Sequence, residues 1–464
     1  MSRVSLDAKS ALAARLAELA VGPTAAIRLG LEGVRKVAQA MGLPMDANDE
    51  VRLACPTVVV AGTNGKGSTC AMLASMAQQA GYRVSVYTSP HLLAFEERLA
   101  FDGVPADAQQ WLQALDRVRD AQQTVALQEG LTFFEIVTLA AFDLVHRTTP
   151  ELAIFEIGLG GRLDAVNVLA NDASVLTSVD LDHQAYLGKT REAIGFEKAH
   201  VARPDQPFVV ADPVPPATVL QVAERIGADV WLFGQDFNYQ GDRQQWSWVG
   251  RGQRRNAMAY PALRGANQLL NASAALAVLS SIRHQLPVSQ QAVRQGLAMV
   301  SLPGRFQVLP GQPAVVLDVA HNPHAAAVLA TNLDQMGFFP QTIAVLGLLS
   351  DKDAKGLLAK LVGRVDHWCL TDLDARETGG RARSAESIAE VLRALQTELP
   401  DGGRAGSGPA TISLHQTPEQ AIVHAGSLAD PGDRIVVFGS FHTVASGWQA
   451  AHRLGQAPHA SSAH

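Results

Sequence analysis

The stretch VVVAGTNGKGSTCAMLASMAQQAGYRV, from Val58 to Val84, decides the fold of this chain. An apolar run ends at Ala61, a glycine-rich segment follows, and Ser68 opens a helical pattern that closes at Gly81. A glycine-rich turn between a strand and a helix directs backbone N–H groups and the positive end of the helix dipole at an anion. The stretch therefore predicts a phosphate-binding loop at Gly62–Ser68.

This loop departs from the standard P-loop pattern, G-x-x-x-x-G-K-[ST], at two places. Val60 stands where the first glycine belongs, and Gly67 separates Lys66 from Ser68. Lys66 supplies positive charge for the β- and γ-phosphates of ATP, and a hydroxyl at the helix start suits Mg²⁺. The alternative is an N-capped helix after a glycine turn, with Lys66 in solvent. We favour nucleotide binding, by the residues Gly62, Thr63, Asn64, Gly65, Lys66, Gly67, Ser68 and Thr69.

The composition limits the classes of function. The 464 residues predict two or three domains, and 47% hydrophobic with 18% charged residues is typical of a soluble globular protein. A net charge of -6 argues against non-specific nucleic-acid binding. We find no signal peptide and no apolar run of about 18 residues, so we expect no membrane span. The 3 scattered cysteines fit a reduced compartment, and we expect a cytoplasmic protein.

Apolar runs alternate with helical patterns, which predicts α/β architecture with mostly parallel sheets covered on both faces. The predicted strands of the first half are Thr57–Ala61, Arg83–Tyr87, Leu152–Ile157, Ser174–Val179 and Pro207–Ala211, with a helix at Ser68–Ala80. The aromatic and arginine-rich stretch Asp236–Leu263 predicts a small antiparallel meander on the sheet edge, followed by a helix at Asn267–Ile282.

A second, Rossmann-like α/β series follows Pro and Gly punctuation around residues 303–313. We therefore predict a P-loop ATPase-like domain at 1–302 and a second α/β domain at 303–464. The predicted strands of the second domain are Ala314–Ala320, Thr342–Gly347, Asp366–Leu370, Thr411–Leu414 and Arg434–Gly439. We expect a flexible loop at Glu398–Gly408 and disorder in the tail Gln456–His464.

Two polar residues follow predicted strands of the first domain. Glu156 ends the apolar run LAIFE, at the sheet edge where open α/β folds bind ligands. A carboxylate near Lys66 and Ser68 suits a Mg²⁺ that bridges phosphates. The alternative for Glu156 is an ion pair with an arginine such as Arg162. His183 follows another strand in SVDLDH, where a solvated loop histidine is the alternative.

Four motifs together give a resemblance to a known family. GTNGKGS at Gly62–Ser68, TSPH at Thr88–His91, EIGLGGRLD at Glu156–Asp164 with Asn167, and DLDH at Asp180–His183 resemble the folylpolyglutamate synthase family. This family belongs to the Mur ligase superfamily of ATP-dependent amide-bond-forming enzymes. The match covers nearly the whole chain with the motifs in order.

The resemblance implies that ATP phosphorylates a carboxylate and that an amine then displaces phosphate. The implied substrates are dihydropteroate, reduced folates and L-glutamate, with dihydrofolate and polyglutamated folates as products. Two Mg²⁺ sites are implied, and a carbamylated Lys198 helps to hold the second. The implied metal ligands are Ser68, Ser89, Glu156 and His183, and the implied catalytic residues are Lys66, Glu156, His183 and Lys198. From composition alone, Lys198 is an exposed helical lysine paired with a nearby glutamate.

The resemblance also assigns binding residues. It places Asn267, Arg305, Asp318 and His321 on ATP, bound between domains that close around it, although Asn267 has N-capping as a rival use. Asp164 resembles the residue that hydrogen-bonds the pteridine ring, and Phe133 or Phe134 stacks on that ring unless both belong to the core. The candidates for glutamate binding are Asp351–Asp353, Ser440 and His442.

Several alternatives stay open on the sequence. The same fold with only one of the two activities is the nearest rival. A P-loop ATPase that drives conformational change fits less well, because the second α/β domain with LDVAHNPHA suits an acceptor site. A cell-wall ligase and a non-catalytic nucleotide-binding module fit least. By analogy with domain closure around ATP, we expect a monomer.

Overall fold

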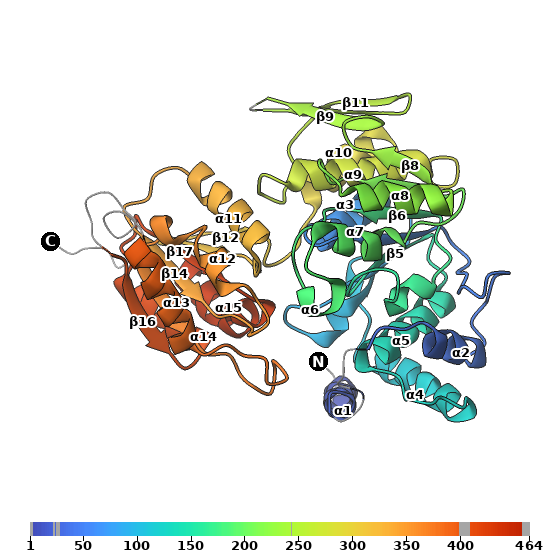
Figure 1. Ribbon diagram of the computed structural model, residues 1–464, viewed down its shortest axis with the longest axis horizontal. Coiled ribbons are helices and arrows are strands. Elements are labelled where there is room, and N and C mark those ends of the chain that lie inside the picture. The colour runs from blue at the N-terminus through green and yellow to red at the C-terminus, as the bar shows by residue number, and fades with distance from the viewer. Residues whose placement is uncertain (1–2, 22–23, 25–27, 243, 399–408, 457–464) are drawn as a thin grey trace. The chain divides into compact units, whose positions relative to one another are not determined.

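The computed structural model describes residues 3–21, 24, 28–242, 244–398 and 409–456. The chain divides into two compact units, each with its own hydrophobic core (Figure 1). Unit 1 comprises Met1–Ala262 and Gln268–Ser301, and unit 2 comprises Leu263–Asn267 and Leu302–His464. The short segment Leu263–Asn267, ahead of helix α9, therefore groups with unit 2.

Unit 1 is built on an 8-stranded sheet in the order β4-β3-β2-β5-β1-β6-β7-β8. The central strand β1 is buried at every residue because its sequence, TVVVA, is apolar enough to be covered on both faces. Only β3 and β4 run antiparallel to their neighbours in this sheet. The strands are β1 Thr57–Ala61, β2 Val84–Tyr87, β3 Leu99–Phe101, β4 Val104–Pro105, β5 Leu152–Glu156, β6 Ala173–Leu176, β7 Pro207–Val210 and β8 Asp229–Leu232.

Helices cover this sheet, and α3 packs against β1, β2 and β5 as well as α9 and α10. Two of them begin at capping boxes, Asp107 with Gln110 for α4 and Thr132 with Glu135 for α5. The helices of unit 1 are α1 Arg3–Leu19, α2 Glu32–Ala40, α3 Lys66–Gln79, α4 Ala108–Thr124, α5 Phe133–Thr148, α6 Gln184–Leu187, α7 Arg191–Ala199, α8 Ala217–Ile226, α9 Gln268–Ser281 and α10 Gln290–Met299, with 3₁₀ turns at Phe95–Arg98 and Ala165–Val168.

The predicted meander is antiparallel, as expected, but it does not extend the large sheet. β9 Phe237–Gly241, β10 Trp246–Gly250 and β11 Gln253–Met258 form a separate 3-stranded sheet. This sheet packs on α9, and the buried Trp246 and Trp248 fill its inner face. The prediction of an edge position was wrong because these tryptophans need an apolar helix to cover them.

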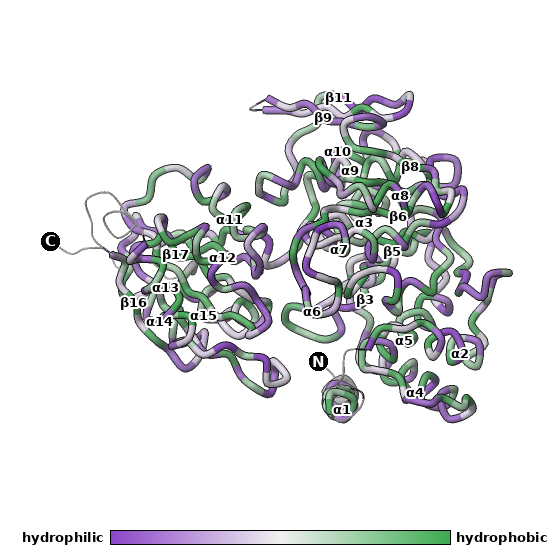
Figure 2. Tube along the Cα trace, in the orientation of Figure 1, coloured by the Kyte–Doolittle hydropathy of each residue, from purple (hydrophilic) through white to green (hydrophobic). Residues whose placement is uncertain are grey.

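Unit 2 has a 6-stranded sheet in the order β12-β13-β17-β14-β15-β16, parallel except for β12. The strands are β12 Gln307–Leu309, β13 Ala314–Leu317, β14 Thr342–Leu346, β15 His367–Thr371, β16 Thr411–His415 and β17 Arg434–Phe438. The helices are α11 Pro323–Gln335, α12 Ala354–Leu358, α13 Ala385–Glu398, α14 Pro418–Leu428 and α15 Phe441–Gln456, with a 3₁₀ turn at Val362–Arg364. Figure 2 shows apolar residues along the central strands and polar ones in the outer loops.

The predicted fold class is confirmed, since both units carry mostly parallel sheets covered by helices. Residues 399–408 and 457–464, for which we predicted a loop and a tail, lie outside the described residues. Glu398 and Gln456, which we predicted as the first residues of the loop and of the tail, are instead the last residues of α13 and α15. None of the helices in the described residues has the length and hydropathy that crossing a bilayer requires.

Candidate active site

The phosphate loop of unit 1 joins β1 to α3 and needs glycine at two positions. Gly62 has φ +147° and Gly65 has φ +88°, a region that side chains disfavour. A Cβ atom on Gly62 would lie 1.9 Å from Thr177 Oγ1, and one on Gly65 would lie 2.5 Å from Asn271 Oδ1. Val60, which replaces the first glycine of the standard pattern, is a buried residue of β1. The loop is therefore shorter than a standard P-loop because the strand continues further.

The start of α3 is arranged to receive an anion. Within the described residues no side chain caps this helix, which begins at Lys66 with Gly65 as its N-cap. The first N–H groups of a helix have no partner inside it and carry the positive end of its dipole. The Thr69 hydroxyl donates to Gly65 O at 3.0 Å, so Ser68 is the hydroxyl residue of this turn that suits a metal.

Lys66 and Glu156 lie together at this end of the sheet. Lys66 Nζ donates to Gly62 O at 3.1 Å and to Thr63 O at 3.3 Å, and it lies 3.8 Å from Glu156 Oε1. Glu156 ends β5 beside β1 and is only 6% exposed. The alternative pairing of Glu156 with Arg162 does not hold, because Arg162 pairs with Glu197 at 2.9 Å.

The oxygen donors that gather here suit a hard divalent cation. Ser68 lies in the first turn of α3, Glu156 ends β5, and Ser89 follows β2, which pairs with β5. Among the described residues, no group of three or more His, Cys, Asp or Glu side chains is positioned to hold a metal ion.

Lys198 is not the exposed lysine that composition suggested. It lies on α7, is 5% exposed, and its amine donates to Gly62 O at 3.1 Å. Burial, reinforced by the charge of Lys66, lowers the pKa of Lys198 to about 7. The backbone of α7 at Glu197 packs closely against Gly161 because Gly161 has no side chain. A Cβ atom there would lie 2.6 Å from Glu197 O.

His183 lies in the segment that follows β6. It adopts φ +50° as the residue before α6, and its N–H donates to Asp182 Oδ1 at 2.8 Å. The charge of Asp182 in turn acts on Lys198. Asp182 thus links the other two residues: its carboxylate accepts from the His183 N–H, and its charge acts on Lys198, which donates to the phosphate loop.

Asp164 and Phe134 border the loop after β5. Asp164 is 2% exposed, accepts from Leu159 N at 2.7 Å and Val166 N at 3.0 Å, and burial raises its pKa to about 6. The ring of Phe134 fills the space beside Gly158, where a Cβ would lie 2.5 Å from its Cζ. Phe133 contacts another aromatic residue, with its ring centroid 6.4 Å from that of Phe95, and both Phe133 and Phe134 are half-buried and pack against the core.

In unit 2, two of the predicted ATP residues, Arg305 and His321, lie near one aromatic ring, and Asp318 is close enough for their charges to act on it. The Arg305 guanidinium lies 5.0 Å from the Phe441 ring centroid, and the His321 ring lies 6.5 Å from it. Asp318 accepts from Phe306 N at 2.9 Å and Ala320 N at 2.7 Å, and burial raises its pKa. Asn267 also belongs to unit 2 and directly precedes α9.

The residues predicted for glutamate follow strands of the same sheet. Ser440 and His442 come after β17, and Ser440 Oγ accepts from Thr443 N at 2.9 Å. Burial lowers the pKa of His442. In the segment Asp351–Asp353, Asp351 pairs with Lys352 at 3.6 Å and Asp353 caps α12. The pair Ser440 and His442 is therefore at a strand end, whereas Asp353 already has a structural partner.

Sequence reasoning missed three residues that contact the phosphate loop. Thr177 and Ser178 hydrogen-bond to Asn64, and the side chain of Asn271 lies against Gly65. A signal for the first two was present, because hydroxyl residues directly after a parallel strand lie at the same sheet edge as the loop after its neighbour. The prediction had used only His183 of this segment.

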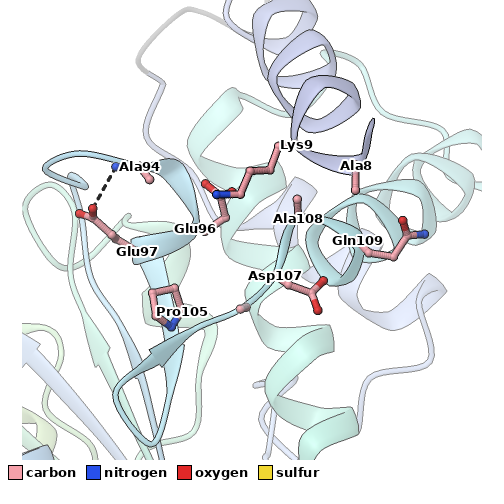
Figure 3. A pocket seen from close by; sticks show the side chains of 10 residues that line it. Ala8, Lys9, Ala94, Glu96, Glu97, Pro105, Asp107, Ala108 and Gln109 are labelled. Carbon is pink, nitrogen blue, oxygen red and sulfur yellow. Dashed lines mark hydrogen bonds between the residues drawn. The ribbon is translucent and has the colours of Figure 1, made fainter. Parts of the chain in front are cut away.

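A cavity of about 540 Å³ lies apart from these residues (Figure 3). Figure 3 shows small apolar side chains with Lys9 and three carboxylates, and none of the predicted site residues lines it. The lining residues are Ala8, Lys9, Ala94, Glu96, Glu97, Pro105, Ala106, Asp107, Ala108 and Gln109.

Comparison with known proteins agrees with this geometry. Residues 60–279 match the Mur ligase middle domain, and residues 304–441 match the glutamate ligase domain of Mur ligases. The dihydrofolate synthase/folylpolyglutamate synthase of Escherichia coli K12 is 37% identical over 440 residues, which cover 95% of each chain. This chain belongs to the dihydrofolate synthase/folylpolyglutamate synthase family. The resemblance predicted from the four motifs is thereby confirmed.

Solved structures of the family have the same fold. A structure of E. coli FolC in complex with DHPP and ADP is 35% identical, with a TM-score of 0.82 over 94% of this chain and 97% of that chain. A bifunctional folylpolyglutamate synthase/dihydrofolate synthase with Mn, AMPPNP and L-glutamate bound is 38% identical, with a TM-score of 0.81 over 95% and 98%. These two family members therefore bind ADP with DHPP, and AMPPNP with Mn and L-glutamate, respectively.

Proposed function

We propose that this protein is an ATP-dependent ligase that adds L-glutamate to 7,8-dihydropteroate and then adds γ-linked glutamates to reduced folates. One observation carries this function in the structure. Lys66 and Glu156 lie 3.8 Å apart beside an uncapped helix start, in a chain that matches both Mur ligase domains. That arrangement suits transfer of a phosphoryl group to an acceptor carboxylate.

The reaction has two steps. An oxygen of the substrate carboxylate attacks the γ-phosphorus of ATP, and the bond from that phosphorus to the β-phosphate oxygen breaks. ADP departs, and the substrate has become an acyl phosphate. The amine of glutamate then attacks the acyl carbon, loses a proton, and phosphate departs with the oxygen that it gained. The products are an amide, ADP and inorganic phosphate, so no covalent enzyme intermediate is needed.

The residues of the phosphate loop hold ATP for the first step. N–H groups at the start of α3 are directed at the phosphates, and Lys66 neutralises charge on the transferring group. Ser68, Ser89 and Glu156 offer oxygens that fit one Mg²⁺, and His183 with Lys198 fits a second. When bound, the metal ions reduce the repulsion between the carboxylate and the triphosphate.

Carbamylation of Lys198 is part of this proposal. A free neutral amine is the species that reacts with carbon dioxide, and a pKa of about 7 leaves about half of the amine neutral at pH 7. The carbamate is an anion, which suits a second Mg²⁺ near His183. The burial of the Lys198 side chain beside Gly62 O supports this role, because a charge on that side chain acts directly on the phosphate loop.

Substrate binding is proposed for residues of both units. Phe134 and Asp164 bind the pterin in unit 1, and in unit 2 Asn267, Arg305, Asp318 and His321 contact ATP, with Ser440 and His442 for glutamate. The Arg305 guanidinium over Phe441 supports an anion site in unit 2. We accordingly propose that residues 1–302 bind ATP and pterin and that residues 303–464 form the glutamate-ligase domain. A cytoplasmic monomer is the proposed state.

The experiment that tests this function is ADP release by the purified protein with Mg²⁺ and ATP. Dihydropteroate and tetrahydrofolate are compared as acceptors, with and without L-glutamate. Release that needs glutamate with both acceptors is the expected result. Dependence on one acceptor reduces the protein to a single activity, and release that needs neither acceptor nor glutamate rejects the ligase in favour of another ATPase.

A further inference from the structure

The hydroxyl side chains of two residues after β6 hold the backbone of one residue of the phosphate loop. Thr177 Oγ1 lies 2.7 Å from Asn64 O and 3.2 Å from Ala61 O. Ser178 Oγ accepts from Asn64 N at 3.1 Å and lies 3.1 Å from Asn64 O. Both the N–H and the C=O of Asn64 are therefore held from the neighbouring strand.

The backbone completes this contact. Thr63 N donates to Ser178 O at 2.8 Å, and Thr63 Oγ1 exchanges hydrogen bonds with Asp180 at 3.0 and 3.2 Å. Thr177 is buried, and its hydroxyl fills the space where Gly62 lacks a side chain. The segment Thr177–Asp180, which leads on to His183, thus holds the phosphate loop in place by hydrogen bonds.

This contact decides which N–H groups the loop presents. Those of Thr63 and Asn64 point at Ser178, so the groups directed at an anion begin with the first turn of α3. Rotation of the two peptide groups that flank Asn64 would turn Gly65 and the start of that helix with them. The backbone orientation of Asn64 therefore sets the orientation of the donors that follow it.

We propose that Thr177 and Ser178 are positioning residues for ATP, which act through the backbone of Asn64 on the N–H groups that bind the phosphates. This inference rests on the proposed function in that it takes the bound anion to be the phosphate chain of ATP. Neither residue carries charge, so their effect is on the geometry of the loop. Losing them increases the cost of ordering the loop around a nucleotide.

The test measures Mg-ADP affinity by calorimetry and the KM for ATP in the ligase assay. Thr177→Val keeps the shape of the side chain and removes the hydroxyl, Thr177→Ser keeps the hydroxyl, and Ser178→Ala removes the second one. Thr57→Val is the matched control, because its buried hydroxyl bonds Cys55 O at 3.1 Å at the far end of β1. Melting temperature is recorded for every variant.

Thr177→Val is expected to raise both Kd and KM by about tenfold, the factor that the loss of one hydrogen bond gives at its upper range. Thr177→Ser is expected to stay within about twofold of the wild type. Thr177→Val with Ser178→Ala is expected to be non-additive, since both hydroxyls hold the same carbonyl.

Wild-type affinity in Thr177→Val, or an equal loss in Thr57→Val at the same drop in melting temperature, overturns the proposal. Failure of the proposed ligase function can be distinguished from failure of this proposal about Thr177. In that case the wild type shows no glutamate-dependent turnover, while the ADP affinities of the variants still decide the role of Thr177.

Discussion

Replacing Lys198 by methionine removes a buried amine and is expected to stabilise the protein at neutral pH. Burial, with a smaller contribution from Lys66, lowers the pKa of Lys198 from 10.5 to about 7. In the unfolded chain the amine regains its usual pKa. Between about pH 7 and pH 10.5 the unfolded state therefore binds a proton that the folded state lacks. The stability of the wild type is accordingly expected to rise with pH across this window.

The size of the effect follows from the two pKa values. The pKa values of Lys198 in the unfolded and folded states differ by about 3.5 (10.5 minus 7). Each pKa unit corresponds to 1.36 kcal/mol, so burying the charged amine lowers the free energy of unfolding by about 5 kcal/mol at pH 7 and below. The methionine variant also loses the bond from Lys198 Nζ to Gly62 O, which is worth about 1 kcal/mol. We therefore expect a net gain of about 4 kcal/mol at pH 7 that disappears near pH 10.

The assay is urea unfolding at several pH values, without nucleotide and in bicarbonate-free buffer so that no carbamate forms. Lys189→Met is the matched control, because Lys189 is an exposed lysine of the same unit. The control is expected to keep the pH dependence of the wild type. A Lys198→Met variant that is less stable than the wild type at pH 7, or that keeps its pH dependence, refutes the reasoning.

Three further predictions concern turnover and packing. Lys66→Ala is expected to abolish ATP-dependent turnover through loss of phosphate neutralisation, and full activity would remove Lys66 from the site. Gly161→Ala places a Cβ 2.6 Å from Glu197 O and 2.9 Å from Lys198 Cα, so melting temperature and activity should both fall. Gly432→Ala, with no atom nearer than 3.8 Å, should change neither. Removing bicarbonate should lower wild-type turnover and its return restore it, and turnover that ignores bicarbonate contradicts a carbamate on Lys198.

Buried strands were the most predictable part of the fold. The run TVVVA gives β1 with the predicted bounds, Thr57–Ala61, because a strand covered on both faces is apolar throughout. The strands β3, β4 and β12 were missed because two or three residues carry no pattern that separates them from loops. The strand β8 was missed because its sequence, DVWL, is only partly buried and is not an apolar run. The helix after the phosphate loop begins at Lys66 rather than Ser68, because Gly65 takes the N-cap position.

The burial of Lys198 had a signal in the sequence that composition alone overlooks. Ile194, four residues earlier on α7, is fully buried, and residues at that spacing share a face of a helix. Lys198 therefore lies on the inner face of α7. The adjacent residues Phe133 and Phe134 separate for the same reason, since neighbours on a helix point in different directions.

The sequence places Thr177 at the same sheet edge as the phosphate loop, but its hydrogen-bond partner, like those of Asp164, could not be read from the sequence. Thr177 reaches Asn64 only because β6 pairs with β1 in a parallel register, which no local pattern specifies. Asp164 accepts from two backbone N–H groups of its own loop, a structural use that exists beside the proposed contact to pterin. Side-chain partners set by strand order thus had to come from the structure.

The most direct test of the central claim is to follow a heavy oxygen isotope from the carboxylate of dihydropteroate during turnover with ATP and glutamate. Both carboxylate oxygens are labelled, and the phosphate and the amide product are analysed by mass spectrometry. An acyl phosphate predicts one labelled oxygen in each phosphate released and one retained in the amide. Phosphate without label, formed at the same rate as the amide, would contradict phosphorylation of the substrate carboxylate.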